Sequence, residues 1–114
     1  MATLEQIAWA AGLFEGEGSI TFMPRGEHAD LQVALVMTDE DVVRRFDAIV
    51  DRGRVYGPYS PLSHGLRRKP IWRWMATGDA AHDVLDLIGP WLSPRRAAQA
   101  LRYGVSLEGE NRKT

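Results

Sequence analysis

The segment Trp9–Ile20, with the sequence WAAGLFEGEGSI, constrains the fold more than any other part of the 114-residue chain. Small residues recur every four positions, at Ala8, Gly12 and Gly16, along a helical pattern that covers residues 3–15 and ends at Gly16. This spacing places them on one side of a helix, where a second helix could approach closely. The remaining positions are largely apolar, so the pattern predicts a helix that is buried nearly all round (Ile7, Trp9, Leu13 and Phe14).

A helix with such a stripe requires a closely packed neighbour, and no other predicted helix carries a matching stripe. We therefore predict that the neighbour is the same helix of a second copy, in a two-fold homodimer that meets at Ala8, Gly12 and Gly16. The alternative is that the helix packs closely on its own sheet. The sequence alone leaves both arrangements open.

Two carboxylates, Glu15 and Glu17, lie between glycines where this helix ends. The helix dipole is negative at that end, so both acids favour a nearby positive charge. In a two-fold dimer joined at this helix, the paired carboxylates would form an oxygen site for a divalent cation. The chain has no cysteine and only three scattered histidines, which favours Mg²⁺ over Zn²⁺ and excludes a disulfide scaffold or zinc finger. The alternative is a polar turn after a helix.

The rest of the sequence predicts the element order α-β-β-α-β-β-α-α. Residues 19–23 and 31–37 alternate as a hairpin, and Thr38 with Asp41 resembles a capping box that opens a helix over 39–51. Residues 54–59 and 70–76 form a second hairpin, a helix begins at Asp79, and Ser93-Pro94 opens a last helix over 94–106. This order predicts an α+β fold with one antiparallel sheet and helices on a single face. The domain is expected to span residues 1–107, with a frayed polar tail over 108–114.

Alternation within the strands divides their side chains between two faces of the sheet. We expect the apolar set to face the core, together with both tryptophans of the last strand (Ile20, Phe22, Leu31, Val33, Leu35, Met37, Trp72 and Trp74). The other, largely polar set would then take the open face (Ser19, Thr21, Met23, Gln32, Ala34, Val36 and Arg73). A register shift of one residue would exchange the two sets.

The charge balance argues against a simple nucleic-acid binder, because the net charge is −1 and the pI is about 6.3. One segment differs: residues 54–78 carry five basic residues and no acidic residue. This segment is either a basic strip suited to nucleic acid or a solvated loop with chance arginines. No signal peptide or membrane span is predicted, so we expect a cytoplasmic protein that does not bind membranes. His28, His64 and His82 are expected at the surface.

The segment Ala10–Gly18, AAGLFEGEG, resembles the motif of the LAGLIDADG homing endonucleases. It keeps the small Ala-Gly pair, Leu13, both acids and the final glycine, and the element order matches that family over about the first hundred residues. The resemblance implies a saddle-shaped sheet that lies on double-stranded DNA, with the motif helices at the central interface. Because the motif occurs once, it implies a homodimer that cleaves a long pseudo-palindromic site. We expect a bacterial or phage-encoded gene, and the sequence leaves open whether an intron, an intein or a free-standing gene carries it.

The resemblance also implies roles for particular residues. Glu17 matches the second acid of the motif, which holds a divalent cation such as Mg²⁺ or Mn²⁺, and Glu15 matches the first acid, which serves the helix interface and capping. Arg95 and Asp39 occupy positions where the family places groups around the metal-bound water, so both are candidate catalytic residues. Arg95 and its neighbour Arg96 oppose the dipole of their own helix, which independently indicates a nearby anion such as phosphate. Arg96 is nevertheless expected to be exposed.

The expected DNA contacts comprise the open face of the sheet (Ser19, Thr21, Met23, Gln32 and Arg73) and the links between strands (Arg25, Arg67, Arg68 and Lys69). For Asp39, a helix N-terminal acid is an alternative interpretation. A maturase-like or regulatory protein that binds DNA or RNA without cutting is the alternative to an endonuclease. A more distant alternative is a protein domain that serves only for dimerisation.

Overall fold

A computed structural model describes residues 1–26, 28–60, 62–63, 66–67 and 69–107 of the chain. Its elements are α1 (Leu4–Glu17), β1 (Gly18–Arg25), β2 (His28–Met37), α2 (Glu40–Val50), β3 (Arg54–Tyr59), β4 (Leu62–Ser63), β5 (Leu66–Arg67), β6 (Ile71–Thr77), α3 (Gly78–Ile88), the 3₁₀ turn η1 (Gly89–Trp91) and α4 (Pro94–Leu101). The predicted α+β class and element order are confirmed. The short β4–β5 hairpin is an addition that the sequence patterns did not predict.

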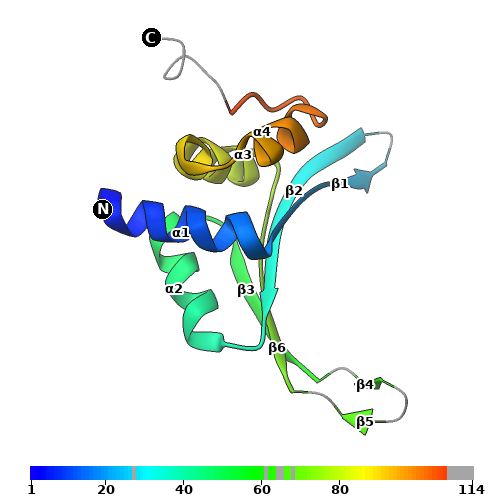
Figure 1. Cartoon of the computed structure of the whole chain (residues 1–114). Coiled ribbons are helices and arrows are strands. Elements are labelled where there is room, and N and C mark those ends of the chain that lie inside the picture. The colour runs from blue at the N-terminus through cyan, green and yellow to red at the C-terminus, as the bar shows by residue number, and fades with distance from the viewer. Residues whose placement is uncertain (27, 61, 64–65, 68, 108–114) are drawn as a thin grey trace.

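Four strands form one antiparallel sheet in the order β1-β2-β6-β3. The helices pack on one side of this sheet, and α1 passes directly into β1 without a loop (Figure 1). The β4–β5 hairpin lies between β3 and β6 in the chain and projects beyond the end of the sheet (Figure 1). The other broad face of the sheet is therefore left open, as the sequence predicts.

An aromatic cluster forms the centre of the core. Phe14 of α1, Phe46 of α2 and Trp74 of β6 are all fully buried. The Phe46 ring meets the Trp74 ring edge-on at 4.7 Å between centroids, and Trp74 Nε1 donates a hydrogen bond of 2.9 Å to the carbonyl of Arg52. Fully burying three large aromatic side chains contributes several kcal/mol and fixes how α1, α2 and the sheet pack together.

Helix ends show where local patterns succeed and fail. Thr3 caps α1 through its hydroxyl, and the Gln6 side chain completes a capping box. The predicted capping box at Thr38 is wrong: Asp39 is the N-cap residue of α2, and no side chain caps that end. The last helix is shorter than expected and ends at Leu101, because Gly104 adopts a positive φ of 79° and turns the chain back.

Candidate functional site

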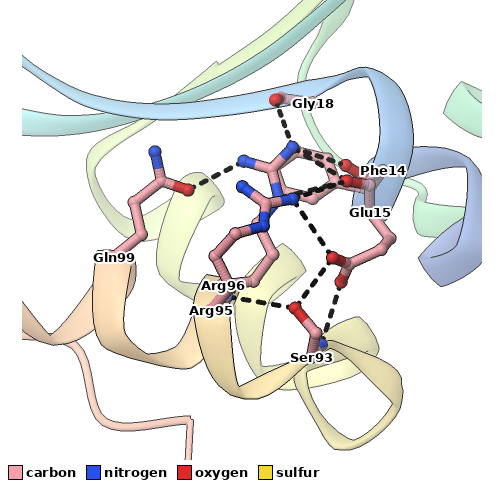
Figure 2. Close-up of polar contacts among 7 residues, drawn as sticks. All are labelled: Phe14, Glu15, Gly18, Ser93, Arg95, Arg96 and Gln99. Atoms are coloured by element: carbon pink, nitrogen blue, oxygen red, sulfur yellow. Dashed lines mark hydrogen bonds and ion pairs between the residues drawn. The ribbon is translucent and has the colours of Figure 1, made fainter.

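The carboxyl end of α1 is held by Arg96, which comes from α4 (Figure 2). Arg96 is 5% exposed, and its Nη2 donates to the carbonyls of Phe14 at 3.2 Å, Glu15 at 3.0 Å and Gly18 at 2.7 Å. Carbonyls at the end of a helix have no partner within that helix, and α1 has no basic residue in its last turn. The expectation that Arg96 is exposed is therefore wrong, because these carbonyls draw its guanidinium into the protein.

Glu15 lies beside the start of α4 and is bound there. Its Oε1 accepts from the backbone N–H of Ser93 at 2.9 Å, and its Oε2 accepts from the Ser93 hydroxyl at 2.8 Å. Arg95 Nη2 forms an ion pair with Oε2 at 3.3 Å, although the Arg95 side chain is 66% exposed (Figure 2). The anion that the two arginines indicated is thus present within the chain: it is the Glu15 carboxylate together with the negative end of α1.

Opposing influences act on the ionisation of Glu15. Burial raises the pKa of Glu15, but hydrogen bonds from Ser93 and the positive charges of Arg95 and Arg96 lower it by more. The net effect is a pKa below the ordinary value of a glutamic acid. Glu15 is therefore held as a carboxylate and is neutralised by its own chain.

Glu17 has a different environment, although it lies only one residue beyond Gly16. Its side chain is exposed, and among the described residues no hydrogen bond or ion pair engages its carboxylate. The part of the chain that the structure describes also contains no cluster of three or more His, Asp or Glu side chains able to hold a metal ion. The described part of one chain therefore presents a single carboxylate at this position, which is fewer ligands than a divalent cation takes.

Asp39 follows β2 and is exposed at the start of α2. Together with Thr38, Glu40, Asp41 and Lys69 it lines a shallow pocket. Within the described residues, no hydrogen bond or ion pair joins Asp39 to Glu17 or Arg95. The single chain thus brings Arg95 to the end of α1 but does not bring Asp39 into contact with either residue.

The small-residue stripe of α1 lies on the open side of that helix. Gly12 and Gly16 are exposed, and a Cβ added at either would have no atom within 4 Å. The core contacts of α1 come instead from Ala10, Ala11 and Phe14, on the opposite side. The prediction of burial nearly all round is therefore wrong for a single chain. The helix does pack on its own sheet, as the alternative has it, but Gly12 and Gly16 take no part in that contact.

The open face of the sheet carries the predicted polar and basic residues. Register places Thr21, Gln32 and Thr77 in one row across β1, β2 and β6, and places Val36, Arg73 and Tyr56 in another across β2, β6 and β3. Ser19, Thr21, Met23 and Arg73 are exposed, whereas Gln32 is half-buried with an Oε1 that has no hydrogen-bond partner. Asp30 is the one acidic residue among the described strand positions. The predicted division is therefore confirmed for the exposed residues, whereas Ala34, also expected on the open face, is buried.

One core-facing residue departs from its expected burial. Phe22 is 45% exposed, and the Tyr103 ring packs against it at 4.7 Å between centroids. Trp74 is buried and Trp72 is half-buried on the same face, as expected, and His82 is exposed.

The predicted contacts in the links between strands are only partly described. Arg25 ends β1 and Arg67 lies in β5, but only their backbones are described. Lys69 is exposed and precedes β6. Arg68, His64 and the tail 108–114 lie outside the described residues.

Comparisons of sequence identify no relative of this chain: no family model matches it, and no curated protein is significantly similar to it. No described helix combines the length and apolar character needed to cross a bilayer.

Comparison of structure finds homing endonucleases. The structure of I-CvuI in complex with its target is similar over 88% of this chain, with a TM-score of 0.64 and 17% identity. The archaeal intron-encoded I-Vdi141I, solved with DNA, matches 88% of this chain with a TM-score of 0.58 and 13% identity, and covers 70% of that protein. I-CeuI, encoded by a group I intron and also solved with DNA, matches 97% of this chain with a TM-score of 0.59 and 16% identity, and covers 57% of that protein.

This chain spans 64% of the length of I-CvuI. The match includes the helices as well as the sheet, because it extends over most of the present chain. The resemblance first seen in Ala10–Gly18 is confirmed in three dimensions, and the chain has the fold of the LAGLIDADG homing endonucleases.

Proposed function

We propose that this chain is the subunit of a site-specific double-strand DNA endonuclease that acts as a homodimer on a long pseudo-palindromic site. The observation that carries the proposal is that the two motif acids have different environments. Glu15 is neutralised by Ser93, Arg95 and Arg96, whereas Glu17, two residues later, is exposed and has no cation beside it among the described residues. A carboxylate kept free at a helix terminus is suited to a divalent cation.

Glu17 is the proposed ligand for Mg²⁺ or Mn²⁺. A second Glu17 from the partner subunit and oxygens of the DNA phosphates would supply further ligands, because one carboxylate does not hold such an ion alone. The bound cation supplies charge stabilisation at the scissile phosphate and an activated water. Arg95 is proposed to lie near the developing charge, with the exposed guanidinium that it keeps beside Glu15. Asp39, at the start of α2, is proposed to orient the attacking water.

The open face of the sheet is the proposed DNA-binding surface. Its exposed hydroxyl groups and the half-buried amide of Gln32 suit base edges, and Arg73 with the basic segment 54–78 suits phosphates. Structurally similar proteins solved with DNA support this role, since I-CvuI, I-Vdi141I and I-CeuI are all seen in such complexes. The acidic residues that give the chain its net negative charge lie mainly on the helices, away from this face.

The open stripe of α1 is the proposed homodimer interface, with Ala8, Gly12, Gly16 and the adjacent Glu15 near the two-fold axis. Two helices whose facing residues lack large side chains can pack with their backbones close together. We further propose that residues 1–107 act as one domain with a polar tail. The protein is proposed to be bacterial or phage-encoded and to work in the cytoplasm, with its gene in an intron, in an intein or free-standing.

Cleavage of a randomised library of duplexes tests the proposal. We expect Mg²⁺-dependent double-strand cleavage, and we expect Glu17→Gln to slow it by at least about 100-fold while the affinity for duplex DNA is retained. Glu5→Gln is the matched control, because Glu5 is an exposed acid at the other end of the same helix. Equal losses in both variants would contradict a special role for Glu17.

A protein that binds DNA or RNA without cutting is the second candidate. It is favoured by Asp39, since an acid stands where the family resemblance implies a polar water-orienting group, and an acid there adds repulsion near a phosphate. Tight binding of a selected duplex without Mg²⁺- or Mn²⁺-dependent cleavage would establish this alternative and reject the enzyme.

A further inference from the structure

We propose that Arg96 is a positioning residue whose guanidinium fixes the chain turn that carries Glu17, and thereby sets where the Glu17 carboxylate lies. The inference rests on the proposed role of Glu17 as the cation ligand. It assigns the function of the one charged side chain that is buried within the described part of the chain.

The contacts of Arg96 flank Glu17 on both sides. Nη2 reaches the carbonyl of Glu15, before Glu17, at 3.0 Å and the carbonyl of Gly18, after it, at 2.7 Å. Nε adds a second bond to the Glu15 carbonyl at 3.3 Å. Rotation of the backbone at Glu17 would turn one of these carbonyls away from the guanidinium, so the contacts hold the turn in one conformation.

The guanidinium is itself fixed. Nη1 donates to Gln99 Oε1 at 2.7 Å, and the guanidinium carbon lies 5.4 Å from the centroid of the Phe14 ring (Figure 2). Phe14 is fully buried, and a Cβ at Gly18 would lie only 2.4 Å from that ring. Phe14 is therefore packed between the start of β1 and the Arg96 guanidinium.

The junction between α1 and β1 explains why an outside donor is needed. Helices commonly end on a left-handed residue whose N–H groups satisfy the last carbonyls. Gly18 instead adopts an extended conformation, with φ −80° and ψ 164°, and β1 starts at that residue. The Gly18 N–H still reaches the Phe14 carbonyl, and Arg96 supplies donors to the Glu15 and Gly18 carbonyls. Its planar group with five N–H donors suits several acceptors better than an ammonium does.

The test compares Arg96→Met and Arg96→Lys with Arg102→Gln, an exposed arginine just after the same helix. The first readout is ¹⁵N relaxation of the Glu17 and Gly18 amides in the metal-free protein. The second is Ca²⁺ binding to the complex with a duplex selected from the library, and the third is the cleavage rate at saturating DNA.

For Arg96→Met we expect increased amide motion at both residues, Ca²⁺ affinity lower by about tenfold or more, and slower cleavage, with DNA affinity changed by less than about threefold. Arg96→Lys should recover part of each loss, and Arg102→Gln should match the wild type. A folded Arg96→Met protein with unchanged amide motion and unchanged Ca²⁺ affinity would overturn the inference.

If Arg96→Met does not fold, Gln99→Met retains the guanidinium but removes its support. A smaller increase in Glu17 amide motion then supports the inference, and unchanged motion overturns it. If the wild type neither binds Ca²⁺ nor cuts DNA, the proposed function fails, whereas the relaxation data on Glu17 and Gly18 still decide whether Arg96 fixes the turn.

Discussion

The hydroxyl of Ser93 serves two helices at once: it accepts from the backbone N–H of Arg96 at 3.2 Å, and it donates to Glu15 Oε2 at 2.8 Å. The first bond caps α4, and the second binds the last turn of α1. A small side chain thus joins segments 78 positions apart in the sequence.

Ser93→Ala removes both bonds, and we expect it to lower the free energy of unfolding by about 2 kcal/mol. Ser93→Asp separates the two roles, because aspartate is a good cap but its charge would face Glu15. It should therefore be less stable than Ser93→Asn, which caps equally well without that charge. Chemical denaturation at pH 7 measures the differences, and equal stability of the Asp and Asn variants would show that the Glu15 contact is unimportant.

Glu15 should make the stability depend on pH in the acid range. Its pKa is lower in the folded protein than in the unfolded chain, so the ionised form stabilises the fold above the unfolded value of about 4.3. That stabilisation is lost as the pH falls through the folded pKa. The wild type should therefore exceed Glu15→Gln in free energy of unfolding at pH 7, and the gap should close below about pH 4.

Glu5→Gln serves as the control for this titration, because Glu5 is exposed in the first turn of the same helix. Parallel stability profiles for the wild type and Glu15→Gln between pH 7 and pH 2.5 would contradict the assigned cause.

The stripe of α1 predicts opposite effects on folding and association. Gly12→Ala should stabilise the single chain by up to about 1 kcal/mol, since the added methyl meets no atom within 4 Å and alanine favours a helix. Gly12→Leu should abolish the dimer, because a large side chain separates the two backbones. Analytical ultracentrifugation measures the association, with Ala98→Leu as the control for added apolar bulk on an exposed helical position. A wild type that stays monomeric at high concentration would reject the interface.

Arg73 lies between Val36 and Tyr56 on the open face of the sheet and is exposed. If it contacts a phosphate, Arg73→Ala should weaken binding to all duplexes about equally and reduce the salt dependence of binding by about one ion. Arg102→Ala, a basic residue on the helical side, should leave both unchanged. Fluorescence anisotropy at salt concentrations from about 50 to about 300 mM measures the affinity and its salt dependence.

Patterns of short range predicted most of the fold. Alternation in β1, β2 and β6 placed Ile20, Val33 and Trp74 in the core, because one buried face leaves only one acceptable register. Ser93 before a proline also predicts the start of α4 correctly, because a helix cap depends only on the next few residues.

The failures concern partners that are distant in sequence. Nothing near Arg96 in the chain shows that its guanidinium satisfies carbonyls at Phe14 and Gly18, so it looked like one of two surface arginines. The absence of any basic residue in the last turn of α1 was the available signal. Thr38 failed as a cap because Asp39 holds the N-cap position of α2, and neither side chain makes the bond.

The contact between Arg96 and the Glu17 turn bears on when, during synthesis, that turn becomes fixed. The ribosome releases α1 and β1 early, but their junction gains its guanidinium only after α4 has emerged and packed. If Arg96 fixes the turn as proposed, chains that end before α4 would carry Glu17 on an unfixed turn, and the proposed cation site would form only once α4 has packed.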